Sequence, residues 1–136
     1  MSLPSRFSIY IDGRPVAIPQ EPQENHHPIF DAQAGNPGAG TPPAVFEVQE
    51  GQGGIQLVSG SYALGRFQVE DMSLMPKRVG WCKRDEAQML QPIHVRNEGN
   101  GPELSFSGAK LAFIDNKLFA PLLPDHSAKK IEIRPM

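Results

Sequence analysis

Residues 62–78, YALGRFQVEDMSLMPKR, carry the pattern that decides the fold of this chain. In this stretch a short apolar run meets a turn, and a second apolar run follows. Residues 108–123, GAKLAFIDNKLFAPLL, show a similar arrangement further along the chain. Recurrence of one strand and turn pattern is typical of repeat architectures. The two stretches therefore predict a repeated all-β fold.

Glycine and proline interrupt the sequence throughout its length. The chain of 136 residues contains 13 glycines and 14 prolines. Proline inside a helix costs about 3 kcal/mol, so the sequence nearly excludes helix. Short segments with alternating apolar and polar residues remain, such as Phe7, Ile9 and Ile11, and this period of two predicts half-buried strands.

A repeat of about 48 residues relates these strands. Ile9, Leu57 and Phe106 are separated by 48 and 49 residues, and each is followed by a turn. The expected turns are Asp12-Gly13, Ser59-Gly60 and Ser107-Gly108. Three later strands follow in each unit, and they are expected at residues 16–18, 29–30 and 45–48, at 63–67, 79–82 and 93–95, and at 111–114, 117–122 and 131–133.

Three units of four strands predict a single β-trefoil domain, with units at about 6–50, 51–97 and 98–136. In that fold six strands close a barrel and six form hairpins that cap one end, which largely removes sheet edges. A sandwich without a repeat is the alternative. The expected core residues are Phe7, Ile9, Val16, Ile18, Phe46, Val48, Ile55, Leu57, Leu64, Trp81, Ile93, Val95, Leu104, Phe106, Phe113, Leu118, Phe119, Ile131 and Ile133.

Charge and cysteine content limit the possible partners. The net charge is only -2, which argues against a nucleic-acid partner. The single cysteine, Cys82, cannot form an internal disulfide and is expected to be a buried, inert thiol beside Trp81. We find no signal-peptide pattern and no apolar run near the ~18 residues of a membrane helix. A cytoplasmic protein without a membrane partner is therefore expected.

Two insertions in the first unit are the expected places for function, since a symmetric core does not need them. Residues 31–43, DAQAGNPGAGTPP, have no apolar side chains that could anchor them in a core. Residues 19–27, PQEPQENHH, are different, because Pro19, Pro22 and Pro28 bias the backbone around them toward extended geometry. An extended loop resembles a protease substrate.

Residues 63–79, ALGRFQVEDMSLMPKRV, resemble the serine protease inhibitor family of mushrooms typified by cospin, a β-trefoil family. In residues 63–79 and in the pattern of that family, a Gly-Arg pair precedes an acidic pair, a Ser-Leu pair and a Pro-Lys pair. Residues 115–122, DNKLFAPL, are similar to the third-unit segment of the same family. The resemblance covers about a quarter of the chain, and it implies reversible inhibition of a trypsin-like protease by an exposed loop of the first unit.

The chain departs from that pattern at the residue that would enter the protease pocket. A trypsin-type pocket requires Arg or Lys, and residues 19–27 contain neither. The candidate protease-binding residues in this loop are Gln23, Glu24, Asn25 and His26. Asn25 would suit an asparagine-specific protease, so inhibition of cysteine or asparagine-specific proteases is an alternative.

Basic residues elsewhere are further candidates for the primary position. Lys83 and Arg84 begin the connection 82–91, CKRDEAQMLQ, which is expected to be an exposed charged loop. Arg14 lies in the first hairpin and precedes a proline. Lys77 and Arg78 are expected to be structural, forming with Glu70-Asp71 a self-neutralising charged turn.

Enzyme and cofactor chemistry find little support in the sequence. His26-His27 lack a partner at metal-ligand spacing, and Asp125-His126-Ser127 are consecutive and cannot align as a triad. No catalytic residue, metal or cofactor is therefore expected. A carbohydrate-binding trefoil is the remaining alternative, with glycan as its partner and Asp115-Asn116 as the nearest candidate sugar-binding pair.

Overall fold

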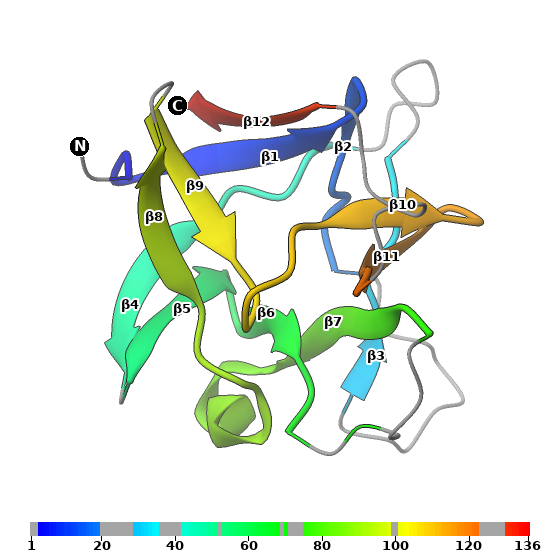
Figure 1. Ribbon diagram of the computed structural model, residues 1–136. Helices are drawn as coiled ribbons and strands as arrows, with labels where there is room; N and C mark the ends of the chain where they lie inside the picture. Colours follow the sequence, from blue (N-terminus) through cyan, green and yellow to red (C-terminus); the bar gives the residue numbers. More distant parts are fainter. Residues whose placement is uncertain are drawn as a thin grey trace.

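The computed structural model describes residues 3–19, 29–35, 42–51, 53–68, 70, 75–98, 101–122 and 130–136. Short strands dominate these ranges, and one short helix lies between two of them (Figure 1). The elements are β1 (Phe7–Ile11), β2 (Arg14–Pro15), β3 (Ile29–Asp31), β4 (Glu47–Gly51), β5 (Gly54–Ser59), β6 (Tyr62–Arg66), β7 (Lys77–Lys83), η1 (Arg84–Met89), β8 (His94–Glu98), β9 (Gly101–Ser105), β10 (Ala112–Ile114), β11 (Lys117–Ala120) and β12 (Ile131–Pro135).

The strands form antiparallel sheets, so the all-β prediction is confirmed. One sheet has the order β12-β1-β2, and a second has the order β10-β11-β7-β6-β5-β4 with β3 also paired to β7. Strands β8 and β9 form a separate ribbon. Helix is nearly absent from the described ranges, as expected. The exception there is η1, a 3₁₀ helix at Arg84–Met89, in a segment without glycine or proline.

Pairing between the strands follows a regular order along the chain. Strand β4 pairs with β5, β8 pairs with β9, and β12 pairs with β1. Strand β7 pairs with both β3 and β11, and Gln33 forms a bridge with Lys117 at the start of β11. Two bridges, Phe7 with Phe46 and Ile55 with Ile93, join further segments. These strand pairs and bridges bring together segments that lie far apart in the sequence.

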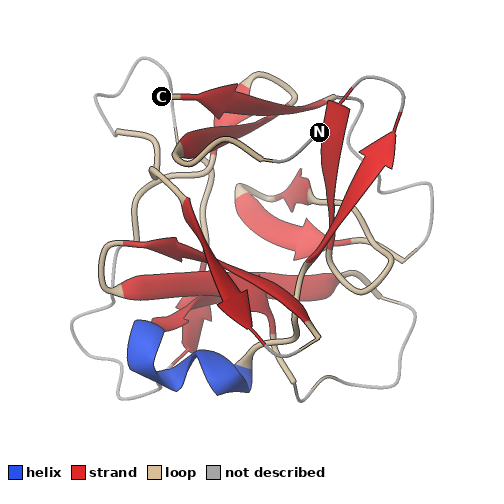
Figure 2. Ribbon diagram, turned by 90° about the vertical axis from the view of Figure 1, so that its left-hand side faces the viewer, coloured by secondary structure: helices blue, strands red, loops and turns tan. Residues whose placement is uncertain are grey.

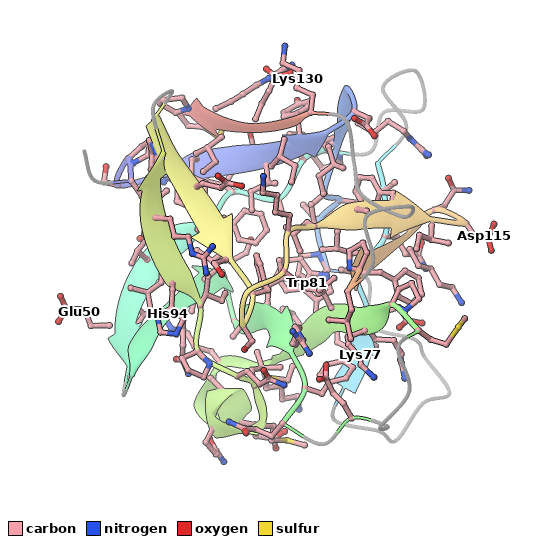
Figure 3. All side chains as sticks on the ribbon, in the orientation of Figure 1. Glu50, Lys77, Trp81, His94, Asp115 and Lys130 are labelled. Atoms are coloured by element: carbon pink, nitrogen blue, oxygen red, sulfur yellow. The ribbon has the colours of Figure 1, made fainter. Side chains whose placement is uncertain are left out.

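The core lies between the strands, with Trp81 at its centre (Figure 3). The Trp81 ring stacks on Phe46 with the ring centroids 5.7 Å apart, and Phe46 in turn stacks on Phe7 at 6.0 Å. Most of the expected core residues belong to this cluster or pack against it. Burial of an aromatic side chain of this size contributes several kcal/mol, so these three rings dominate the packing.

Two residues predicted to be in the core are instead exposed. Val48 is 38% exposed and Ile18 is 37% exposed. Val48 belongs to β4, in which every residue is exposed, so this strand lies at the surface, whereas its partner β5 contributes Leu57 to the core. Ile18 follows the last bridge of its segment, Ala17 with Pro43, and therefore leaves the packed region. Phe119, also expected in the core, is half-buried.

Turn geometry confirms two of the three expected turns and shifts the third. Asp12 and Gly13 have φ of 50° and 84°, and Ser107 and Gly108 have φ of 56° and 91°. Such left-handed pairs fit the right-handed twist of a hairpin. In the second hairpin Ser59 pairs with Tyr62, so the turn is Gly60-Ser61, one residue later than expected.

The insertion at 31–43 is anchored at its ends, contrary to the sequence prediction. Ala32 is completely buried in the core, and its carbonyl oxygen accepts a 2.9 Å hydrogen bond from the Leu118 amide. Ala34 forms a bridge with Val16. Alanine is small enough to be buried where strands approach closely, so apolar anchoring did not require a large side chain. Residues 36–41 lie outside the described ranges.

The short helix η1 covers the outer face of β5, β6 and β7 (Figure 2). Ala87 of η1 and the following Leu90 pack in a second cluster with Val58, Ala63, Phe67 and Cys82. The connection 82–91 is therefore partly buried and is not the exposed loop that its composition predicted. None of the helices in the described ranges is long and apolar enough to cross a membrane.

Candidate functional site

Arg84 and Lys83 lie where β7 ends and η1 begins. Lys83 is exposed, pairs with Tyr62 across the sheet and has extended backbone geometry with φ of -65° and ψ of 144°. The Arg84 amide donates a 2.8 Å hydrogen bond to the Ser61 carbonyl oxygen. Both residues are therefore fixed to the neighbouring hairpin turn through their backbone.

The Arg84 side chain is held by two uncharged acceptors. Its Nε donates to Gln49 Oε1 at 3.1 Å, and its Nη1 lies 3.5 Å from the Gly60 carbonyl oxygen. Neither acceptor carries a charge, so these bonds orient the guanidinium without neutralising it. An oriented guanidinium presents a fixed set of donors to an anion.

A shallow surface depression lies beside this guanidinium. The hairpin turn between β5 and β6 forms one wall, and the junction of β7 with η1 forms the other. The lining residues are Gly60, Ser61, Tyr62, Lys83, Arg84 and Asp85. Tyr62 is half-buried, and its ring meets Phe30 edge to face at 5.6 Å. The depression thus combines cations, one carboxylate, a hydroxyl and an aromatic ring.

The other predicted site residues lie elsewhere. Gln23, Glu24, Asn25 and His26 are outside the described residues. Arg14 lies in β2, and its Nη1 donates a 2.6 Å hydrogen bond to Asn116 Oδ1, with its guanidinium carbon 6.0 Å from the Phe113 ring centre. The structure therefore does not bring Arg14 together with Lys83 and Arg84.

Asp115 and Asn116, the candidate sugar-binding pair, form the turn between β10 and β11. Both have left-handed backbone geometry, with φ of 52° and 66°. The Asn116 side chain accepts the hydrogen bond from Arg14. The Asn116 amide oxygen therefore binds within the protein, and Asp115 points outward from the turn (Figure 3).

Arg66 and Glu70 belong to a partly buried polar network. Arg66 is 7% exposed and forms an ion pair with Glu70, and its Nη1 donates a 2.8 Å hydrogen bond to the Phe106 carbonyl oxygen. Gln91 Nε2 donates to Glu70 Oε1 at 3.2 Å, and Ser107 donates to Gln91 Oε1. This network connects β6 to the end of β9 and serves packing.

The expected self-neutralising charged turn is wrong for Glu70 and Arg78. Glu70 pairs with Arg66, whereas Arg78 forms a 2.6 Å ion pair with Asp31 of β3. Lys117 lies 3.7 Å from the same Asp31 carboxylate. Lys77 is buried, with 6% of its surface exposed. The charges of this region thus connect separate strands.

Cys82 is buried, as the sequence predicted. Burial, together with the nearby Glu86 and Asp85 carboxylates, raises the pKa of the Cys82 thiol from 9.0 to about 11. A nucleophilic cysteine requires a lowered pKa, so this thiol is poorly suited to covalent chemistry. Within the described ranges no group of three or more His, Cys, Asp or Glu residues is arranged to hold a metal ion.

Sequence reasoning identified Lys83 and Arg84 but missed the residues around them. Gln49 lies 35 positions from Arg84, and Ser61 and Tyr62 lie at the hairpin turn between β5 and β6, more than twenty positions before Arg84. The only signal in the sequence was the Ser-Gly-Ser turn before Tyr62. This turn predicted a hairpin, but it did not show which segment packs beside that hairpin. Searches against protein-family models, curated proteins and solved structures gave no match for this chain.

Proposed function

We propose that the chain is a β-trefoil that inhibits a serine protease through an exposed basic residue, Lys83. Support for the trefoil comes from the pairing of β4 with β5, β8 with β9 and β12 with β1. In each pair the last strand of one four-strand unit joins the first strand of the next, which is the way a barrel closes around three units. The mutual contacts of β3, β7 and β11 are what a cap of three hairpins requires.

The observation that carries the inhibitory function is the geometry of Lys83. Its side chain is exposed, its backbone is extended, and its neighbours on both sides are held by the sheet. A residue fixed in this way loses little conformational entropy when a protease binds it. Lysine is a residue that a trypsin-like pocket accepts.

The other two basic candidates are less suited to enter a protease pocket. Arg84 would have to release Gln49 and the Gly60 carbonyl oxygen, and Arg14 would have to release Asn116. Each release costs hydrogen bonds that involve a charged donor, about 1.5 to 3 kcal/mol apiece where they are shielded from water and less at the surface. Lys83 is therefore the preferred primary residue.

Inhibition of trypsin by the purified protein tests this proposal. We expect the wild-type protein in excess to inhibit trypsin reversibly. Replacing Lys83 with alanine should raise the inhibition constant by about 30-fold or more, because truncation of a central interface residue costs about 2 kcal/mol or more. The matched control is Arg96→Ala, which removes an exposed cation from β8 and should leave inhibition unchanged.

Further proteases and a glycan array separate the alternatives. If replacement of Gln23, Glu24, Asn25 and His26 by alanine abolishes inhibition while Lys83→Ala does not, the inhibitory site belongs to the first-unit loop. Inhibition of papain or an asparagine-specific protease, without inhibition of trypsin, would change the target class. No inhibition by any member of the panel, combined with specific binding on the array, would reject inhibition in favour of a lectin.

A further inference from the structure

We propose that the depression between Gly60 and Asp85 binds an anionic saccharide, meaning a sugar that carries a sulfate or carboxylate group. The depression is lined by two cations, one carboxylate, a serine and a tyrosine. Protease inhibition through Lys83 does not require this combination of groups. The saccharide site therefore stands on its own observations and goes beyond the proposed inhibition.

Arg84 is the group that would bind the anion. Gln49 and the Gly60 carbonyl oxygen hold its guanidinium in place, and both acceptors are neutral. The described ion pairs of the molecule do not include Arg84. Its positive charge is thus oriented, and none of the carboxylates in the described ranges forms an ion pair with it. A guanidinium in this state suits the planar edge of a carboxylate or two oxygens of a sulfate.

Tyr62 and Ser61 supply what a sugar ring needs beside the anion. Tyr62 is one of the residues that line the depression, and its ring is oriented by its edge-to-face contact with Phe30. An aromatic face can cover the apolar CH groups of a sugar ring, while the exposed Ser61 hydroxyl can donate to and accept from sugar hydroxyls. Asp85 adds a strong acceptor for hydroxyl protons.

Asp85 also decides between a saccharide and an acidic peptide. An acidic peptide carries several carboxylates, and one of them would meet the Asp85 carboxylate at unfavourable short range. A sugar with a single anionic group can direct that group to Arg84 and Lys83 while its neutral hydroxyls approach Asp85. The charge pattern of the depression, two cations beside one anion, therefore favours the saccharide.

Calorimetric titration at low ionic strength tests the site with lactose 3′-sulfate, a disaccharide that carries one sulfate group, since salt screens exposed charges. We expect saturable binding at one site. Replacing Arg84 with glutamine should weaken it about tenfold or more, because a hydrogen bond to a charged group contributes at least that factor. Lys83→Gln, which leaves the Arg84 contacts in place, should weaken binding less. Arg96→Gln, with the same change of charge on β8, should bind like the wild type.

Comparison ligands give the results that would overturn the proposal. Inorganic sulfate or a tetraglutamate peptide that binds as tightly as the disaccharide would show that the sugar ring is not recognised. Equal weakening by Arg84→Gln and Arg96→Gln would show that binding is unspecific, and absence of binding to the wild type would reject the site. Trypsin inhibition without saccharide binding would reject this site alone, and saccharide binding without inhibition would reject only the inhibitory function.

Discussion

Arg66 and Glu70 form a two-pronged ion pair within the protein. Arg66 Nε donates to Glu70 Oε2 at 3.1 Å, and Arg66 Nη2 donates to Glu70 Oε1 at 2.7 Å. The two side chains are only 8% and 16% exposed. A third donor of the same guanidinium reaches the Phe106 carbonyl oxygen. Arg66 thus combines a largely buried charge pair with a hydrogen bond to a residue 40 positions away in the sequence.

Removal of Arg66 alone should be strongly destabilising. Arg66→Met leaves the Glu70 carboxylate partly buried without its partner, and the expected loss is about 3 kcal/mol in the free energy of unfolding. The double variant Arg66→Met with Glu70→Leu should lose less than the single variant, because no unpaired charge remains. Urea unfolding measures both. Equal loss in the single and double variants would mean that packing, and not charge, explains the effect.

Phe46 and Val48 should respond very differently to truncation. Phe46 is completely buried and stacks on Trp81, so Phe46→Ala should cost about 3 to 5 kcal/mol. Val48 is 38% exposed, and Val48→Ala should change stability by about 0.5 kcal/mol or less. Thermal unfolding followed by Trp81 fluorescence gives both values. A large effect at Val48 would show that its side chain is packed in the core, as the sequence pattern predicted.

Gly80 and Gly13 require glycine for different reasons. A Cβ atom on Gly80 would overlap the Phe30 carbonyl oxygen and lie 2.9 Å from Phe67 Cζ, so Gly80→Ala should cost about 3 kcal/mol or more. Gly13 has open space around it but φ of 84°, so Gly13→Ala should cost only the backbone strain of about 1 kcal/mol. Chemical denaturation compares the two variants. The contrary result, a larger loss at Gly13, would contradict the close contact of β3 with β7.

Ionisation of Cys82 should lower stability at high pH. The pKa of the thiol is about 11 in the folded protein and near 9.0 in the unfolded chain. Between these values the unfolded chain has lost a proton that the folded protein keeps, so the free energy of unfolding decreases as pH rises from 9 to 11. The stabilising contribution is complete below pH 9. Unfolding experiments on the wild type and on Cys82→Ala measure this contribution. The difference in the free energy of unfolding between the two proteins should shrink by about 1 kcal/mol or more over this pH window. A constant difference would show that the thiol is not desolvated.

Substitution at Lys83 should redirect inhibition if this residue enters the protease pocket. Lys83→Leu should raise the inhibition constant for trypsin by about 30-fold or more and should gain inhibition of chymotrypsin. The reason is that the pocket of each protease selects the side chain of the primary residue. Lys83→Arg should retain trypsin inhibition. Inhibition constants against both proteases are the measurement. Unchanged constants for Lys83→Leu would place the primary residue elsewhere.

Local patterns in the sequence were sufficient for most of the strands and most of the core. The strand expected at 16–18 is wrong, because β2 lies at Arg14–Pro15 and Val16 and Ala17 form only isolated bridges. Alternation around Ile9, Leu57 and Phe106 predicted strands because the side chains of a strand point to opposite faces in turn. Trp81 and Phe46 were expected inside and are buried, since large apolar side chains gain most by leaving water. The same alternation failed at Val48, because period two assigns a face but does not say whether the face is covered.

Only the tertiary structure decided which charged residues meet. The sequence by itself determined an all-β chain with basic residues at Lys83 and Arg84. It could not place Gln49 against Arg84 or Asp31 against Arg78, because these contacts depend on how strands far apart in the chain pack together. Nor could it show that Arg66 neutralises Glu70 within the fold. Residues that are neighbours in the sequence determine where a strand forms. The packing of whole strands against one another determines which charged side chains meet.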